Sequence, residues 1–285
     1  MDWLVLTAFS VVSRAIYGVL TKVLSNQLKV STYTQSVLLP MVGGMMAILI
    51  SPLVGGLHFD FSNVSLMAVA LVVLGQGLGN IAYFQSIKSL TSGTAQIAFS
   101  SILVFNTLLS LVFLNLHLSL INIFGVILLM LAILSVTNGK VEFDKRGVSL
   151  MVLSALLFSV FQLASADLSK QVGTAAYLLI AYFGAALVVF IIKARVVAKD
   201  IMTKDKQVML KISAITAVPS LGNFVFAYYA YREAPQPAKV AMLLTAQVVI
   251  AVLLSYVFLK EKSHIWRKTG AGILVLIAAI LIKQT

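Results

Sequence analysis

One face of a helix near the start of the chain carries a run of polar side chains. Their spacing alternates between three and four residues, which places them on one side of an α-helix. They are Thr7, Ser10, Arg14, Tyr17 and Thr21. The segment around them is apolar, and Arg14 lies near its centre. Because a guanidinium stays charged at any physiological pH, Arg14 requires water, a hydrogen-bond acceptor or an anion beside it.

Arg14 has two interpretations. As a structural residue, it would pair with Asp167 or with backbone carbonyls. As a binding residue, it would hold the anionic group of a ligand, and Tyr17, one turn away, would contact the same ligand. No carboxylate lies comparably deep in an apolar segment, because Asp167 and Glu233 both stand near segment ends. The sequence leaves both interpretations open.

The apolar segments are those of a membrane protein. Of 285 residues, 60% are hydrophobic and 11% are charged, and the mean hydropathy is +1.03. Soluble domains average about 25% charged residues. Because backbone groups in lipid must be satisfied within the protein, apolar runs of about 20 residues are predicted to form spanning helices. Ten such segments are present, at 3–24, 32–54, 64–87, 93–114, 118–137, 148–168, 174–193, 210–231, 237–259 and 266–283.

Further polar side chains fall inside these segments. At membrane depth such side chains are costly, and they face a cavity or the bundle interior rather than lipid. For each one alone, a hydrogen bond between helices, worth about 0.6 kcal/mol, is the alternative to contact with a ligand. We expect one water-accessible cavity, lined by Arg14 together with Asn80, Asn223 and Gln247. The candidate substrate-binding residues are Arg14, Tyr17, Gln76, Asn80, Asn106, Gln162, Asn223 and Gln247.

The two halves of the chain resemble each other. Ser110 to Leu114 matches Ser255 to Leu259, and Gly79-Asn80 matches Gly222-Asn223. Each half holds five helices, so the second half is predicted to cross the membrane in the opposite sense, with a site at the repeat interface. The predicted fold is an all-α membrane protein of ten transmembrane helices, arranged as two inverted five-helix repeats around a central cavity. The repeats are predicted at 1–137 and 148–285, and 138–147 is the connecting loop.

Polar residues are unevenly spread over the ten segments. The fifth and the tenth, at 118–137 and 266–283, have almost none beyond their ends. We therefore expect these two helices to lie at the periphery. The first, third, fourth, sixth, eighth and ninth are expected to line the cavity.

With this organisation, the chain resembles the EamA-type families of the drug/metabolite transporter superfamily over nearly its whole length. The most specific stretch is an apolar helix, a Leu-x-Glu loop and a Gly-led apolar helix, here Leu259-Lys260-Glu261 followed by Gly270. The first half differs, because Leu116 stands where the second half has Glu261. A proline that often precedes this loop in the family is absent from both halves. The resemblance implies secondary transport without ATP, often export, and it names no substrate.

Basic residues fall mainly on one side of the predicted helices. Sixteen Lys and Arg residues can be assigned to one side and three to the other. The basic side is predicted to be cytoplasmic in a plasma or inner membrane, which places both termini on the opposite side. The predicted cytoplasmic loops are 138–147, 193–211 and 260–268.

Several other classes are excluded. The run from Gly75 to Gly79 lies inside an apolar segment with no strand before it, so it predicts close helix packing rather than a phosphate loop. The chain has no cysteine, and His58, His117 and His264 are scattered in predicted loops, so we expect no metal and no cofactor. The net charge of +12 is explained by the loops, so nucleic acid is not an expected partner.

We therefore expect a secondary transporter rather than an enzyme. Its predicted substrate is a small metabolite, an amino acid or another carboxylate-bearing compound, exported by alternating access. The expected partners are this substrate, membrane lipid and a coupling ion, whose identity stays open along with the oligomeric state. The alternative is a flippase-like carrier of a lipid-linked sugar phosphate, in which Arg14 would hold the phosphate.

Overall fold

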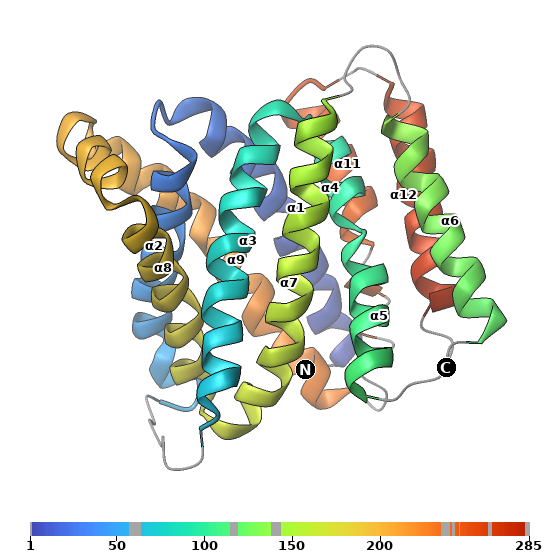
Figure 1. Cartoon of the computed structure of the whole chain (residues 1–285), viewed down its shortest axis with the longest axis horizontal. Coiled ribbons are helices and arrows are strands. Elements are labelled where there is room, and N and C mark those ends of the chain that lie inside the picture. The colour runs from blue at the N-terminus through green and yellow to red at the C-terminus, as the bar shows by residue number, and fades with distance from the viewer. Residues whose placement is uncertain are drawn as a thin grey trace.

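The computed structural model describes residues 2–56, 64–114, 119–137, 144–234, 240, 243–244, 246–261 and 264–282, and these residues form helices and connections without a strand. Figure 1 shows their arrangement. The elements are α1 (Trp3–Gln27), α2 (Thr32–Ile50), η1 (Ser51–Val54), α3 (Leu66–Ser89), α4 (Ser92–Phe99), α5 (Ile102–Leu114), α6 (Leu120–Thr137), α7 (Lys145–Gln171), α8 (Thr174–Thr203), α9 (Lys206–Glu233), α11 (Gln247–Phe258) and α12 (Ile265–Ile282).

The predicted membrane-spanning segments are present as helices. Eight helical stretches of the described chain are long and apolar enough to cross a membrane, with α4 and most of α5 forming one of them. Two shorter apolar helices, at Leu120–Ser135 and Gln247–Phe258, occupy the places of the fifth and ninth predicted segments. The prediction of a helical multi-pass membrane protein is therefore confirmed.

Short polar residues begin most of these helices. The side chains of Ser31, Ser65 and Thr91 accept hydrogen bonds from backbone N–H groups in the first turns of α2, α3 and α4. Asp144 and Asp205 do the same for α7 and α9. Each such cap satisfies a backbone donor that the helix itself leaves unpaired. The turn residues of the sequence thus set where each crossing starts.

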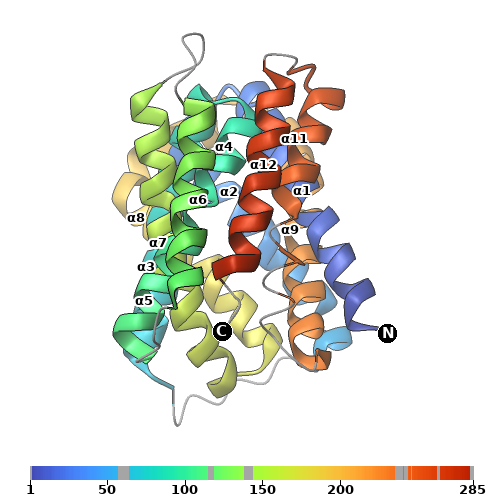
Figure 2. The same cartoon turned by 90° about the vertical axis from the view of Figure 1, so that its right-hand side faces the viewer.

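The helices pack in an order that differs from their order in the chain. α3 lies against α7 and α8, α1 lies against α9 and α11, and α2 lies against α8 and α9. α6 and α12 pack on each other at one edge of the molecule, which Figures 1 and 2 show. The expected peripheral position of these two helices agrees with this arrangement. α1 begins and α12 ends at the same face of the molecule.

Glycines let α3 approach its neighbours closely. A Cβ atom on Gly75 would come within 3.0 Å of the Leu157 carbonyl oxygen in α7, and one on Gly77 within 3.1 Å of the Ala185 carbonyl oxygen in α8. Gly79 likewise faces the ring of Phe158. Alternate glycines of the run therefore face different helices. The predicted role of this run in helix packing is confirmed.

Hydrogen bonds tie several helix ends together at one face, which we call the basic face because Lys22, Lys88, Arg146 and Lys260 lie in or beside them. The Lys22 ammonium at the end of α1 donates to the carbonyl oxygens of Ile87 (2.6 Å) and Leu90 (2.7 Å) at the end of α3. A hydrogen bond from Ser89 in α3 lowers the pKa of the Asp144 carboxyl, which lies at the start of α7. The two ends are thereby linked.

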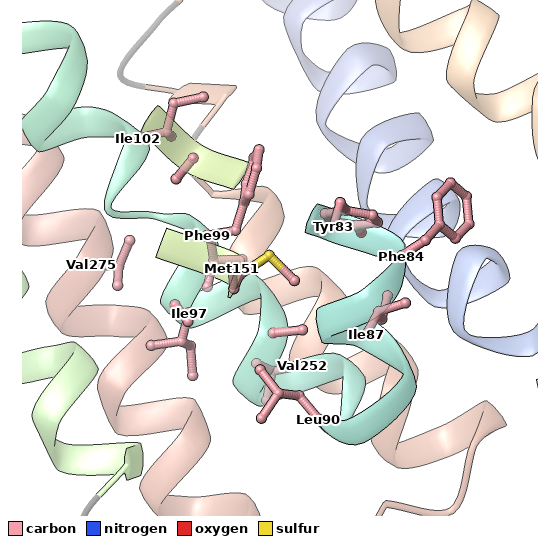
Figure 3. Packing of buried hydrophobic residues seen from close by; sticks show 14 of the residues in the cluster. Tyr83, Phe84, Ile87, Leu90, Ile97, Phe99, Ile102, Met151, Val252 and Val275 are labelled. Carbon is pink, nitrogen blue, oxygen red and sulfur yellow. The ribbon is translucent and has the colours of Figure 1, made fainter. Parts of the chain in front are cut away.

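The largest core cluster of the described residues contains four residues of α4 and side chains from most of the other helices. Figure 3 shows its side chains from α3, α4, α7, α11 and α12, among them Phe84, Ile97 and Met151. All eight residues of α4 are buried. In α5, by contrast, Leu108, Val112 and Phe113 are exposed. The packing around the fourth crossing is thus much tighter on the basic side.

The fourth crossing is not one continuous helix, contrary to prediction. α4 ends at Phe99 and α5 begins at Ile102. Between them, the Ser100 N–H is shared between the carbonyls of Gln96 and Ile97, while the Ser100 hydroxyl also bonds to Ile97. Serine hydroxyls compete with the backbone for carbonyl acceptors, and two adjacent serines concentrate that competition at one point.

The predicted loop at 193–211 is almost entirely helical. α8 continues through a kink at Lys193 (φ −135°, ψ 35°) to Thr203, and α9 begins at Lys206. Hydropathy falls after Lys193, where the apolar crossing ends. The Ala, Arg, Lys and Met residues that follow still favour a helix, so α8 continues. Residues 138–143 of the predicted connecting loop, Leu116, His58 and His117 lie outside the described residues.

Candidate functional site

A small cavity lies at mid-depth between the helices. The space open to the centre of a water molecule is about 30 Å³, which holds about two waters. The cavity in this state thus admits a small polar group, and a larger ligand requires it to widen. Its walls come from α1, α2, α3, α4, α7, α8 and α9. They are formed by Arg14, Tyr17, Leu39, Pro40, Gln76, Asn80, Tyr83, Phe99, Phe158, Tyr182, Ser220 and Phe224.

Arg14 supplies the positive charge of the cavity. Its guanidinium carbon lies 5.5 Å from the ring centroid of Tyr17 and 5.6 Å from that of Phe99, both within the range of a cation–π contact. Among the described hydrogen bonds, none involves the guanidinium, and no described carboxylate forms an ion pair with it. Its N–H donors are therefore available to a group that enters the cavity.

The structural interpretation, in which Arg14 pairs with Asp167, finds no support in the described geometry. Asp167 lies nine residues beyond Phe158 in α7, which is about 13 Å along the helix axis. Because Phe158 already lines the cavity, this rise carries Asp167 well away from Arg14. The side chain of Asp167 lies outside the described residues.

Two amides of α3 face the charge. Gln76 and Asn80 are one turn apart and only 4% and 6% exposed. The Oε1 atom of Gln76 is buried and accepts no hydrogen bond from any described group. Leaving such an acceptor unpaired costs about 1–3 kcal/mol. The site therefore offers donors on Arg14 and an acceptor on Gln76.

Aromatic rings form the rest of the wall. Phe99 meets the rings of Tyr83 and Phe158 edge to face, with centroids 5.8 Å and 5.7 Å away. Tyr182 packs in the same manner on Phe224, at 5.8 Å. The hydroxyls are engaged within the protein: Tyr83 accepts from the Gln96 amide at 3.1 Å, and Tyr182 shares a bond of 3.1 Å with Ser220. These rings thus present mainly apolar surface to a ligand.

Four of the eight candidate residues meet in this cavity. Arg14, Tyr17, Gln76 and Asn80 all line it. Their signal in the sequence was a polar side chain deep in an apolar helix, which is costly unless it faces a partner.

The other four candidates lie elsewhere, so the expectation of one cavity that also includes Asn223 and Gln247 is not met. The Ser10 hydroxyl donates to the Asn223 side chain at 3.0 Å, which joins α1 to α9. The Asn106 amide donates to Gln162 at 2.8 Å, which joins α5 to α7. Gln247 lies at the start of α11, outside the cavity wall. Bonding between helices satisfies Asn106, Gln162 and Asn223.

Sequence reasoning missed the walls contributed by α2 and α8. Leu39, Pro40 and Tyr182 line the cavity although their helices were not expected to do so. Leucine and aromatic side chains carry no signal against an apolar background. Proline inside an apolar helix is the one available signal, since it frees a carbonyl group. Pro40 lines the cavity, and Pro219 directly precedes the lining residue Ser220.

The Leu-x-Glu loop holds the start of α4. The Glu261 carboxylate accepts hydrogen bonds from the backbone N–H groups of Ser92 (2.9 Å) and Gly93 (3.4 Å). The Lys268 ammonium in α12 donates to the Thr91 hydroxyl at 3.0 Å. A carboxylate at a helix N-terminus is favoured by the helix dipole. Since α4 ends in Phe99, this loop fixes one wall of the cavity.

Comparison with known proteins places this architecture in a family. The model of a family described as the EamA-like transporter family matches residues 1–138 and, a second time, residues 145–283. The chain belongs to the EamA-like transporter family. It is therefore a multi-pass membrane transporter of small molecules, within the drug/metabolite superfamily. The cavity of this EamA-like transporter lies among seven of its helices.

Solved structures share the fold of this EamA-like transporter. One of them is entitled "Crystal structure of protein", and it matches with a TM-score of 0.66 and 12% sequence identity. The match covers 97% of this chain and 95% of that chain. A comparison with curated protein sequences gives no match.

Proposed function

We propose that this EamA-like transporter exports a small carboxylate-bearing metabolite, with an amino acid as the leading substrate class. The observation that carries the proposal is the Arg14 guanidinium, which faces the central cavity without an acidic partner among the described residues. A carboxylate fits the donor fork of a guanidinium with two parallel hydrogen bonds. Such a ligand would also neutralise the charge that the cavity now holds.

The remaining walls fit the other parts of an amino acid. The unpaired Oε1 atom of Gln76 is an acceptor for an ammonium group. The rings of Phe99, Phe158 and Phe224 offer surface to an apolar or aromatic side chain. Because the cavity now holds about two waters, the side chain of the substrate occupies space that opens when the helices move.

We infer that the helices move as two inverted repeats, 1–137 and 148–285, which shift against each other during alternating access. The packing of the helices supports this inference, because a contact between two helices has a counterpart between the corresponding helices of the other half. α1 packs on α9 as α7 packs on α3, and α2 packs on α9 as α8 packs on α3. α11 packs on α1 as α5 packs on α7. The contacts correspond when α1, α2, α3 and α5 of the first half are matched with α7, α8, α9 and α11 of the second half.

Individual contacts follow the same exchange. The Ser154 hydroxyl in α7 donates to the Gly79 carbonyl at 2.9 Å. At the corresponding place in the other half, a Cβ atom on Gly222 would lie 3.3 Å from the Ser13 hydroxyl oxygen. Ser13 and Ser154 therefore meet matching glycines of the repeat. This pairing supports a twofold axis through the centre of the bundle, as alternating access requires.

Transport by the purified chain in proteoliposomes tests the proposal. Vesicles loaded with one amino acid at a time are assayed for exchange against the labelled compound, and a hit identifies the substrate. Arg14→Gln is expected to abolish the exchange, and Arg14→Lys to restore it only in part, because a lysine offers a point charge without the fork. Arg267→Gln removes an equal charge from an exposed site and serves as the matched control.

Normal exchange by a folded Arg14→Gln protein would disprove the binding role. If Arg14→Gln fails to fold while Arg14→Lys folds and transports, Arg14 is structural. A chain that moves no soluble metabolite but does move a lipid-linked sugar phosphate between leaflets would be a flippase-like carrier instead.

A further inference from the structure

The last part of α8 leaves the bundle. At Lys193 the backbone adopts φ −135° and ψ 35°, which interrupts the helix before it continues to Thr203. We call residues 194–203 the interfacial helix. In Figure 1 it is the golden stretch that projects beyond the other helices at the upper left. The kink thus redirects the chain at the point where its apolar crossing ends.

One side of the interfacial helix is docked on the start of α2. Val197 and Ile201 pack with Val37 and Tyr33 in a small apolar cluster. The Asp200 carboxylate accepts hydrogen bonds from the Ser31 backbone N–H (2.8 Å) and the Thr34 hydroxyl (2.6 Å). The helix is therefore held in a fixed orientation.

The opposite side combines positive charge with apolar surface. Arg195 and Lys199 are one turn apart, are both exposed, and lie across the helix from Val197. Val196 and Met202 are 38% and 80% exposed on the same helix. A helix with basic side chains beside exposed apolar ones is typical of a membrane surface.

The acidic groups of this region do not neutralise that charge. From Lys193 to Lys211 the chain has six basic residues and two acidic ones. Asp200 is bonded to the start of α2, and Asp205 caps α9 through the N–H groups of Gln207 (2.9 Å) and Val208 (3.2 Å). Both carboxylates are thus turned to helix N-termini, and the region keeps a surplus of positive charge.

We propose that the interfacial helix binds the headgroups of anionic phospholipids. Arg195 and Lys199 contact the lipid phosphates, while Val196 and Met202 lie beside the upper acyl chains. Basic residues close to an anionic bilayer are attracted to its surface. The exposed apolar residues favour a lipid over a soluble polyanion. This inference does not depend on the identity of the transported substrate.

The interfacial helix is also connected to the cavity. Through Asp200, the interfacial helix is bonded to the first turn of α2. α2 in turn lines the cavity with Leu39 and Pro40. An anionic lipid bound to the interfacial helix therefore stabilises one wall of the proposed transport site.

The test is the thermal stability of the purified full chain in detergent with added phosphatidylglycerol or phosphatidylcholine. Phosphatidylglycerol is expected to raise the unfolding midpoint, and phosphatidylcholine to raise it much less. In the variant Arg195→Gln/Lys199→Gln/Lys204→Gln, the shift caused by phosphatidylglycerol is expected to fall by about half or more, since half of the six basic residues are gone. Added salt should weaken the shift in the wild type.

The control variant is Lys88→Gln/Lys260→Gln/Arg267→Gln, which removes equal charge from exposed sites at the basic face. It should keep the full shift. An equal loss in the control, or an unchanged shift in the first variant, would overturn the proposal. Binding of an oligonucleotide that depends on Arg195 and Lys199, without any response to phosphatidylglycerol, would assign the surface to nucleic acid instead.

A second measurement covers the case in which the triple variant fails to fold. The exchange Arg195→Lys/Lys199→Arg keeps the charge and should retain the shift. In the same chain without cysteines, a nitroxide at Met202→Cys should relax faster next to spin-labelled phosphatidylglycerol than next to spin-labelled phosphatidylcholine. Equal relaxation by the two lipids would count against the proposal.

Discussion

Arg14 keeps a full charge at the centre of the bundle, where it lies against the rings of Tyr17 and Phe99. Contacts with the faces of Tyr17 and Phe99 offset part of the cost of burying the guanidinium, at roughly 0.5–2 kcal/mol each. They leave its N–H donors without acceptors, because a ring face does not replace a directed hydrogen bond. Arg14 is therefore available to bind an anion, and its unpaired donors lower the stability of the protein without a ligand.

Gln76 allows this trade between binding and stability to be measured. Gln76→Leu removes a buried acceptor that has no partner, so the unfolding midpoint is expected to stay equal or to rise. Transport should weaken, with KM for the exported substrate about tenfold higher, because one hydrogen bond to the ligand is lost. Dose–response curves in proteoliposomes and thermal unfolding provide the two readouts.

Gln35→Leu is the matched control for that variant. Gln35 in α2 is also fully buried with an unpaired Oε1 atom, but it does not line the cavity. It should gain stability in the same way and leave KM unchanged. An equal rise of KM in both variants would show that the effect of Gln76 is not local to the site.

Polarity decided which site residues could be predicted. Arg14, Gln76 and Asn80 were accessible to prediction because each is expensive in lipid without a partner. Asn223 is also polar and also deep in its helix, but its side chain accepts a hydrogen bond from Ser10. A single sequence does not distinguish a polar residue that lines a cavity from one that forms a hydrogen bond between helices. Tyr182 and Phe99 had no signal, because an aromatic residue is ordinary in a membrane helix.

At the scale of the helices, two glycines at matching sequence positions, Gly125 after Ser110 and Gly270 after Ser255, have different environments. A Cβ atom on Gly125 in α6 would meet the Ala278 carbonyl oxygen of α12 at 2.9 Å. A Cβ atom on Gly270 in α12 would meet nothing within 4 Å. The contact between α6 and α12 therefore requires a glycine on one side only.

Alanine at these two positions should have opposite effects. Gly125→Ala is expected to lower stability by about 1–3 kcal/mol, because the backbone of α12 must move away. Gly270→Ala should raise it by about 0.5–1 kcal/mol, because alanine restricts the unfolded chain and favours the helix. Unfolding curves of both variants in one detergent give the comparison. A stabilising effect of Gly125→Ala would contradict the close approach of the two helices.

The helices were predicted better than their interruptions. Long apolar runs predicted the eight stretches able to span a membrane and the two shorter apolar helices, because spanning a bilayer imposes length and composition together. The break between α4 and α5 depends on how Ser100 shares its carbonyl acceptors, which hydropathy does not record. The interfacial helix was predicted as a loop because hydropathy reports solvation, whereas Lys, Arg and Ala support a helix outside the membrane as well as inside it.

At the scale of the molecule, hydrogen bonds close the basic face around α4. The corner between α3 and α4 is bonded to α1 through Lys22, to the α11–α12 loop through Glu261 and to α12 through Lys268. These bonds surround α4, whose residues are all buried. Under alternating access, opening at the basic face would require this corner to separate from three neighbours at once. The basic side of the cavity is therefore held closed by hydrogen bonds to three neighbours.

The direction of transport depends on which face is cytoplasmic, and α9 allows this to be tested at its two ends. Thr203, just before α9, lies with the surplus of basic residues that is expected to stay in the cytoplasm. Glu233 ends α9 at the opposite face, and both positions are exposed. Because the chain has no cysteine, a single introduced cysteine is the only thiol to react. On intact cells, a membrane-impermeant maleimide should label Glu233→Cys and leave Thr203→Cys unlabelled until the cells are permeabilised. The reverse pattern would place the basic face outside, and the proposed lipid surface would then lie in the outer leaflet.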